Sequence, residues 1–301
     1  KNRAHLRFGL GFDEMPYFCT SHAFCKRIMG ISQVMDGKDV IEFLKEYEFT
    51  LSKNHGVGPK AVRSVVQDPY FDIIERAKTN CHSLKDERLS LDQEQRKGVA
   101  SHMLEPIAES WEKFRLSRVP PVYSFADMIN KFLVDGTPPE LDVLIVDEAQ
   151  DLAELNWRLV EKLAQNAGKV YIAGDDDQAI YEWNGAKPQR FVEYVGEKIV
   201  LDQSYRVPSL VHPIAERISE RIISREPKIY KPRKEEGTVS NVSSIELLPL
   251  DSGQWLILAS CDYMLNDISK GYNVRKYLID NGYPFSHNGY RYIPRSMVSA
   301  I

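Results

Sequence analysis

The stretch that decides the fold is Leu141-Asp-Val-Leu-Ile-Val-Asp-Glu-Ala-Gln-Asp151. Its aliphatic run, residues 143–146, is long enough for one buried strand and ends at two adjacent carboxylates, Asp147 and Glu148. We predict that this strand lies in a parallel sheet with both faces covered. An acid pair at the carboxyl edge of such a sheet fits a magnesium ion carrying phosphate, because Mg²⁺ prefers carboxylates, water and substrate oxygens. The alternative is that Asp147 only caps the next helix.

Two further aliphatic segments end in polar residues in the same way. Residues 169–173 lead into Gly174-Asp-Asp-Asp-Gln178, and residues 198–201 lead into Asp202-Gln-Ser-Tyr-Arg206. Because the carboxyl ends of parallel strands meet at one edge of a sheet, we expect the three loops to lie side by side. The sequence therefore predicts an α/β protein with a nucleotide site at that edge.

Several side chains in these loops suit a nucleotide or a nucleic acid. Gln178 is neutral and can orient a water molecule or contact a phosphate oxygen. Tyr181 and Trp183 lie among polar residues rather than at helical core spacing, which suits stacking on bases. Tyr205 offers a flat ring for a purine, and the Arg206 guanidinium can bind phosphate in a fork that lysine lacks.

Near the amino terminus, residues 17–20 are predicted to form a short strand that leads into a helix. Thr20 can cap this helix, and His22 lies in the same turn. Hydroxyls and a histidine at a helix amino terminus can bind a phosphate backbone. An ordinary capped turn explains the same residues, so both readings stay open at this point.

From about residue 30 to residue 121 the pattern changes to charged, helical segments, which indicates a helical insertion. Within it, Gly56-Val-Gly-Pro-Lys-Ala-Val62 is similar to the glycine hairpin of helix-hairpin-helix DNA-binding modules, although we favour a plain interhelical turn. Trp111 and Phe114 are spaced i, i+3 and are predicted to be core residues rather than a stacking platform.

Two prolines at 120–121 end this region, and a new helix is predicted after them. Ser124 is placed to cap it, with Asp127 at the capping-box position. The spacing of its apolar residues predicts a buried stripe of Phe125, Met128, Ile129 and Phe132.

Beyond the third strand, residues 225–234 are basic and contain proline, and we interpret them as an interdomain linker; phosphate contact is the alternative. A new α/β unit is predicted to follow, with a strand at 254–259 and a helix from about 264 to 281. The chain begins at Lys1 rather than Met and stops in mid-pattern at Ile301, so we expect a piece of a longer protein.

The composition is that of a globular protein, with 43% hydrophobic residues and a net charge of −4 over 301 residues. This balance does not exclude nucleic-acid binding, because a basic groove can lie on an acidic protein. The four cysteines lack CxxC spacing, so we expect neither a zinc site nor a disulfide framework. No apolar run approaches the roughly 18 residues of a membrane span, and we expect a cytoplasmic protein.

The order and spacing of these motifs resemble superfamily 1 helicases of the UvrD/Rep/PcrA group. DEAQD at 147–151 is similar to the Walker B motif of that family, residues 174–186 to motif III, and residues 201–208 to motif IV. Less specific similarities are TSHAF at 20–24 to motif Ib, YSFADMI at 123–129 to the helix before Walker B, and residues 255–292 to the start of the second motor domain.

The resemblance implies a RecA-like P-loop NTPase fold with a parallel sheet, a helical insertion subdomain and the beginning of a second RecA-like domain. The implied domains are 1–29 with 122–224 (first motor domain), 30–121 (insertion), 225–237 (linker) and 238–301 (second motor domain). The implied cofactors are ATP and Mg²⁺. The implied partner is single-stranded DNA or a single-strand/double-strand junction, bound by a monomer in the cytoplasm of a bacterial or phage-type system.

By the same resemblance, Asp147 and Glu148 form the metal site, with Asp147 holding Mg²⁺ and Glu148 polarising the attacking water. Gln178 contacts the γ-phosphate, Tyr205 stacks on adenine and Arg206 reaches the γ-phosphate. The residues expected along the DNA are Thr20, His22, Phe24, Tyr181 and Trp183.

One departure from the family pattern affects the expected activity. The 301 residues contain no GxxxxGK[ST] phosphate loop and no match to motifs V and VI. The resemblance implies that the parent protein is an ATP-driven 3′-to-5′ DNA translocase or helicase in replication, repair or recombination. Because these motifs are missing from the 301 residues, we expect this piece to be nearly inert. The alternatives are a non-catalytic DNA-binding remnant and the motor part of a helicase-nuclease.

Overall fold

The computed structural model describes residues 2–11, 13–47, 68–93, 95–223, 225–260, 264–265, 273–287 and 290–293. The chain forms two compact units. The first contains residues 1–202 and 217–230, and the second contains residues 203–216 and 231–301. The second unit therefore begins earlier than the boundary at 224 expected for the first motor domain, and residues 217–230 return to the first unit.

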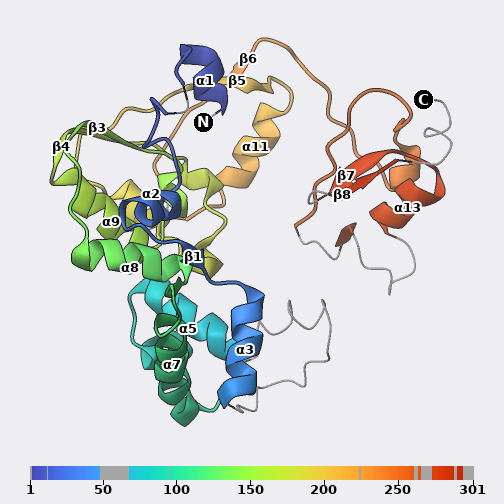
Figure 1. Cartoon of the computed structure of the whole chain (residues 1–301). Helices are drawn as coiled ribbons and strands as arrows, with labels where there is room; N and C mark the ends of the chain where they lie inside the picture. The colour runs from blue at the N-terminus through green and yellow to red at the C-terminus, as the bar shows by residue number, and fades with distance from the viewer. Residues whose placement is uncertain are drawn as a thin grey trace. The chain divides into compact units, whose positions relative to one another are not determined.

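The centre of the first unit is a parallel pair of strands, β3 (Leu141–Val146) and β4 (Ala167–Ile172), as predicted. The helix α9 (Glu154–Ala164) connects them and packs on one face, together with α8 (Phe125–Asp135) (Figure 1). On the other face Ile145 is 69% exposed, and Val143 and Tyr171 are exposed beside it. The prediction that both faces are covered is wrong for the described residues, because only one layer of helices lies against this pair.

The helix α8 forms as its sequence predicts. Ser124 Oγ accepts from the Asp127 N–H, and the Asp127 carboxylate accepts from the Ser124 N–H, so the capping box is complete. Most of the predicted stripe is buried against α2 (Ser21–Ile28) and α9. Phe125 is an exception at 59% exposed, because it lies in the first turn beside the cap and its ring packs on the edge of His22.

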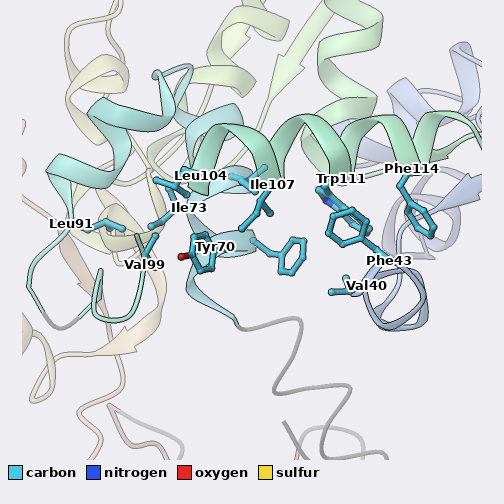
Figure 2. Packing of buried hydrophobic residues seen from close by; sticks show 12 residues of the cluster. Val40, Phe43, Tyr70, Ile73, Leu91, Val99, Leu104, Ile107, Trp111 and Phe114 are labelled. Carbon is cyan, nitrogen blue, oxygen red and sulfur yellow. The ribbon is translucent and has the colours of Figure 1, made fainter. Parts of the chain in front are cut away.

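Within its described residues, the predicted helical insertion contains α3 (Gly37–Tyr47), α5 (Pro69–Asn80), α6 (Leu84–Ser90) and α7 (Ser101–Leu116). These helices share their own apolar core, in which Trp111 and Phe114 are buried as predicted and pack with Phe43 (Figure 2). The parallel pair β1 (Gln33–Val34) and β2 (Val122–Tyr123) brings the two ends of the insertion together. The segment 56–62, for which we favour a plain interhelical turn over a DNA-binding glycine hairpin, lies outside the described residues.

An ion-pair cluster around the buried Arg115 joins the insertion to α8. Arg115 of α7 is buried over the Trp111 ring and pairs with Asp127, which also accepts from Lys78 of α5 at 2.8 Å. Burial alone would raise the pKa of Asp127, but the Lys78 and Arg115 charges outweigh it and hold this pKa well below its usual range. The capping residue of α8 therefore also anchors two helices of the insertion.

The second unit contains β5 (Gln203–Pro208), which pairs in parallel with β6 (Lys231–Arg233), followed by α13 (Val274–Asp280) and the antiparallel pair β7 (Phe285–His287) and β8 (Tyr290–Tyr292). The described residues also form the short helices α1 (Asn2–Phe8) and α10 (Pro188–Val192), both in the first unit, and the helix α11 (His212–Ser219). In the described part of the chain, no helix is long and apolar enough to span a membrane.

Three predicted strands do not form. Residues 17–20, 198–201 and 254–259 are irregular, and their apolar side chains are largely exposed. A strand requires a hydrogen-bonded partner, and among the described residues none of these segments has one. The third strand instead begins at Gln203, where β6 supplies the partner, so the expected single sheet of three strands is replaced by two separate pairs.

Candidate nucleotide and DNA site

Asp147 and Glu148 follow β3 directly and are both exposed at the carboxyl end of the strand pair. The Glu148 N–H donates to Asp147 Oδ1 at 3.0 Å, so Asp147 binds its neighbour and does not cap a helix. The next α-helix, α9, begins after Ala153, which makes no side-chain cap. Glu148 has a left-handed backbone with φ of 54°, a region that residues other than glycine rarely adopt. Both carboxylates are exposed, and carboxylate oxygens are ligands that Mg²⁺ prefers.

Gln150 connects this acid pair to the loop after β4. Its side chain is only 1% exposed. Nε2 donates to Glu148 Oε2 at 2.7 Å, and Oε1 accepts from the Asp175 N–H at 3.0 Å. The backbones of the two loops are also joined, because the Ala149 N–H donates to the Ala173 carbonyl at 3.0 Å. The predicted neighbourhood of the first two strand-end loops is therefore present.

The loop after β4 carries three consecutive carboxylates, Asp175 to Asp177, and each has a cationic partner. Arg225 donates two hydrogen bonds to Asp177, at 2.7 and 2.6 Å. The Lys228 ammonium is buried between Asp175, at 2.8 Å, and Asp176. The three carboxylates lie close enough to hold a cation, but each of them already pairs with Lys228 or Arg225. We therefore read this cluster as a structural ion-pair network.

The pKa values of this network reflect the pairing. Burial disfavours the charged form of Lys228, but the hydrogen bonds to Asp175 and Asp176 outweigh burial and raise the pKa of Lys228. Burial likewise opposes ionisation of Asp175, while Lys228 and Gln178 stabilise its carboxylate and lower its pKa. Both groups are therefore charged near pH 7, and the segment Arg225–Tyr230 is held to the loop by buried ion pairs.

Gln178 lies at the end of the short 3₁₀ turn Asp176–Gln178 and is exposed. Its Nε2 donates to Asp175 Oδ2 at 2.6 Å. The Asp175 carboxylate also accepts from Lys228 and, at 3.3 Å, from the Tyr230 hydroxyl. The exposed Gln178 side chain is thus hydrogen-bonded to an aspartate that is itself held in place. A residue that contacts phosphate needs this combination of exposure and fixed position.

Tyr181 and Trp183 stand on an exposed loop whose backbone is fixed by the insertion. Trp183 is 67% exposed, and its ring centroid lies 6.4 Å from that of Tyr181. Arg76 of α5 donates to the Trp183 carbonyl at 2.7 Å. Gly185 has φ of 94°, and a Cβ there would lie 2.1 Å from Asn80 Oδ1, so only glycine fits against α5. The Tyr181 and Trp183 rings are therefore exposed to solvent, while the main chain of their loop is fixed by contacts with α5.

Glu87 of α6 organises the residues that hold this loop. It is fully buried and accepts from Arg76 Nε at 3.0 Å and Asn80 Nδ2 at 2.9 Å, and it contacts His82 Nδ1 at 3.0 Å. Burial would raise the pKa of Glu87, but these hydrogen bonds together lower it. The carboxylate is therefore ionised near neutral pH and orients Arg76 toward the aromatic loop.

The three candidate residues at the start of α2 have different surroundings. Thr20 is exposed and caps the helix, accepting from the Ala23 N–H at 3.3 Å. His22 is partly buried against Phe125, and burial lowers its pKa. Phe24 is 7% exposed and packs on Phe132, so its ring belongs to the core and is not available to DNA. Thr20 and His22 remain accessible candidates.

Tyr205 and Arg206 belong to the second unit, within β5 rather than after a strand as expected. Both side chains are exposed, and the Arg206 N–H donates to Ser204 Oγ at 3.4 Å. The expectation that they share one sheet edge with Asp147 is not met, since β5 pairs with β6 and not with β3 or β4.

Sequence reasoning missed the residues that support this site: Gln150, Arg76, Glu87, Arg225 and Lys228. Gln150 lies inside the DEAQD motif at 147–151, but nothing in the motif indicates which loop its amide binds. The basic run at 225–234 could have pointed to Arg225 and Lys228, because the three consecutive aspartates at 175–177 require nearby cations.

Parts of this chain are similar to curated bacterial helicases. DNA helicase II of Escherichia coli is 42% identical over 82 residues, covering 26% of this chain and 11% of that protein. The ATP-dependent DNA helicase Rep of Escherichia coli is 33% identical over 95 residues, covering 30% of this chain and 14% of that protein. The ATP-dependent DNA helicase PcrA of Bacillus subtilis is 30% identical over 97 residues, covering 31% and 13%. Each match thus spans a small part of a much longer relative.

The family comparison covers more of the chain. The UvrD/REP helicase N-terminal domain matches residues 14–197, which include the insertion, the acid pair, the acidic loop and the aromatic loop. This match spans more than half of the 301 residues. The chain therefore belongs to the UvrD/REP helicase family.

Proposed function

We propose that the protein containing this chain is an ATP-driven translocase or helicase that acts on single-stranded DNA. One observation carries the proposal: the acid pair after β3 and the Asp175–Gln178 loop after β4 lie together and are joined by the buried Gln150 amide. A hydrolytic site needs a metal-binding carboxylate, a water-polarising carboxylate and a phosphate contact at one edge of a sheet. Asp147, Glu148 and Gln178 supply these groups.

In this proposal each residue of the edge has a distinct role. Asp147 would hold Mg²⁺, which would supply positive charge to the phosphates, and its exposed carboxylate fits that ligand chemistry. Glu148 would polarise the attacking water, and Gln178 would contact the γ-phosphate. Tyr205 would stack on adenine and Arg206 would reach the γ-phosphate, consistent with their exposed side chains.

The proposed DNA contacts all lie in the first unit. Tyr181 and Trp183 would stack on bases, because their rings are exposed on a fixed backbone. Thr20 and His22 would contact the phosphate backbone at the start of α2. We further propose movement in the 3′-to-5′ direction and a role in replication, repair or recombination, by analogy with the family.

The proposal is tested by DNA-stimulated ATP hydrolysis in the complete gene product. Glu148→Gln is expected to lower kcat by roughly 10²- to 10⁴-fold, the usual contribution of a general base. The 301-residue chain alone is expected to show no DNA-stimulated turnover, because it contains no GxxxxGK[ST] loop. A complete protein that binds DNA but hydrolyses no ATP would instead support a non-catalytic remnant.

A further inference from the structure

Gln150 is a buried amide whose two polar ends are both occupied. Nε2 donates to Glu148 Oε2 at 2.7 Å, and Oε1 accepts from the Asp175 N–H at 3.0 Å. A reversed amide would set its NH₂ against the Asp175 N–H and its oxygen against a carboxylate. Only one orientation satisfies both contacts, so the amide dictates how the Glu148 carboxylate is turned.

Gly174 provides the space that this amide needs. A Cβ at position 174 would lie 2.6 Å from Gln150 Oε1 and 3.2 Å from the Ala149 nitrogen. Gly174 is not among the glycines with left-handed φ, so close approach explains the residue better than an unusual turn does. The backbone after β4 is thus shaped around the Gln150 side chain.

The contacts continue beyond Asp175 to the phosphate-contacting candidate. Asp175 Oδ2 accepts from Gln178 Nε2 at 2.6 Å, while its Oδ1 accepts from Lys228 at 2.8 Å. A hydrogen-bonded path therefore runs from Glu148 through Gln150 and Asp175 to Gln178. Because the Gln150 end is buried, its hydrogen bonds are not exchanged with bulk water and hold their geometry.

We propose that Gln150 is a positioning residue that orients the Glu148 carboxylate and ties it to the Asp175–Gln178 loop. The inference rests on the proposed function, in which Glu148 polarises the attacking water. The Gln150 amide binds one carboxylate oxygen and leaves the other for water. Since the same amide holds the Asp175 N–H, any displacement of the loop that carries Gln178 also turns Glu148. Phosphate contact and water activation are thereby linked.

The first test measures steady-state ATP hydrolysis by the complete gene product. Gln150→Glu keeps the side-chain volume and the acceptor for Asp175, but sets an oxygen against Glu148. We expect kcat to fall roughly 10- to 100-fold, the effect of one hydrogen bond to a charged group, with KM for ATP within about twofold. In a Glu148→Gln background the same substitution should cause little further loss, because the two residues act as a unit.

Matched variants separate this role from a general packing role. Gly174→Ala adds a methyl group that would lie 2.6 Å from Gln150 Oε1 and must displace the amide. This variant should also lower kcat at unchanged KM. Gln165→Glu, an exposed glutamine at the end of α9, should change neither. Wild-type kcat in Gln150→Glu overturns the inference while the proposed function stands. A wild-type protein without ATP hydrolysis overturns both.

The second test does not depend on turnover. In the 301-residue chain, Gln150→Leu removes the acceptor of the Asp175 N–H, and hydrogen exchange at that amide should accelerate by about tenfold or more. The amides of the insertion should keep their protection, which shows that the chain is folded. Unchanged exchange at Asp175 would overturn the proposed path even if the helicase activity is real.

Discussion

Trp183 combines a free side chain with a fixed main chain. The indole is largely exposed, yet its carbonyl accepts a hydrogen bond from Arg76, whose orientation depends on the buried Glu87. A large exposed aromatic ring on a rigid backbone loses little entropy when it stacks on a base. Its contribution to DNA affinity is therefore expected to be large for a single residue.

We expect Trp183→Ala to weaken binding of single-stranded DNA by roughly 1–3 kcal/mol at fixed salt. Fluorescence anisotropy with a labelled oligonucleotide measures the effect. Trp255→Ala, which removes a partly exposed tryptophan of the second unit, serves as the control. An unchanged isotherm for Trp183→Ala would remove this ring from the DNA site.

Asp127 is the residue at which pH should reveal the link between the insertion and α8. Its pKa is lower in the folded chain than in the unfolded chain, so it stabilises the fold above its ordinary pKa of about 4. That stabilisation is lost as the pH falls from this value toward the lower folded pKa. Asp127→Asn should thus destabilise the chain by roughly 3–5 kcal/mol at pH 7, with a smaller difference below about pH 4.

Urea unfolding of the wild type and Asp127→Asn across this pH range measures the change. Asp135→Asn is the matched control, because Asp135 is an exposed carboxylate of the same helix that pairs with Lys131. Its loss should lower the free energy of unfolding by less than about 1 kcal/mol. A pH-independent difference for Asp127→Asn would contradict the role of the charge and leave only the loss of the cap.

At the scale of elements, the segment Arg225–Tyr230 acts as a brace for the loop after β4. Arg225, Lys228 and Tyr230 all donate to the three aspartates, and the Glu226 N–H donates to Asp176 at 2.6 Å. Three adjacent carboxylates would repel one another without these partners. The loop that carries Gln178 therefore owes its conformation to a segment about 50 residues further along the chain.

We expect Lys228→Met to loosen this loop, because Asp175 and Asp176 would be left buried and charged without their partner. Hydrogen exchange at residues 175–178 should accelerate, and the melting temperature at pH 7 should fall. Lower pH should restore part of the loss, since protonation removes the unpaired charges. Lys234→Met, an exposed lysine of the same basic run, is the control. Equal exchange in both variants would refute the brace.

Elements with complete local signals were predictable from the sequence. The aliphatic run at 143–146 and the capping box at Ser124 need only neighbouring residues; the run lies in β3 and the capping box is complete, as predicted. The strands predicted at 198–201 and 254–259 have suitable side chains but no hydrogen-bonded partner in the described chain. The more polar segment 203–208 is a strand because β6 pairs with it, and such pairing is not visible in local composition.

The same distinction applies to the site. The acid pair and Gln178 follow predictable strand ends and could be named from the sequence. The role of Gln150 depends on a contact with Asp175, 25 positions away, and that of Lys228 on a contact 53 positions away. Motifs therefore indicated the candidate site residues, while the residues that hold their side chains and loops became evident only from the tertiary structure.

For the molecule as a whole, two compact units share one chain that passes between them after residues 202, 216 and 230. The first unit contains the acid pair, the acidic loop, the aromatic loop and the insertion. Tyr205 and Arg206 belong to the second. The residues proposed to contact ATP are therefore divided between the two units.

The left-handed backbone at Glu148 lowers the stability of the whole chain at a residue that the proposed activity requires. An L-residue with φ of 54° costs about 1 kcal/mol or more, which glycine would avoid. Glu148→Gly and Glu148→Ala both remove the carboxylate, so both should abolish turnover. Elsewhere glycine is the less stable of the two, but here Glu148→Gly should unfold at higher denaturant concentration than Glu148→Ala. The reverse order would show that the backbone at 148 is relaxed. If the expected order holds, selection for activity keeps this protein less stable than its fold allows.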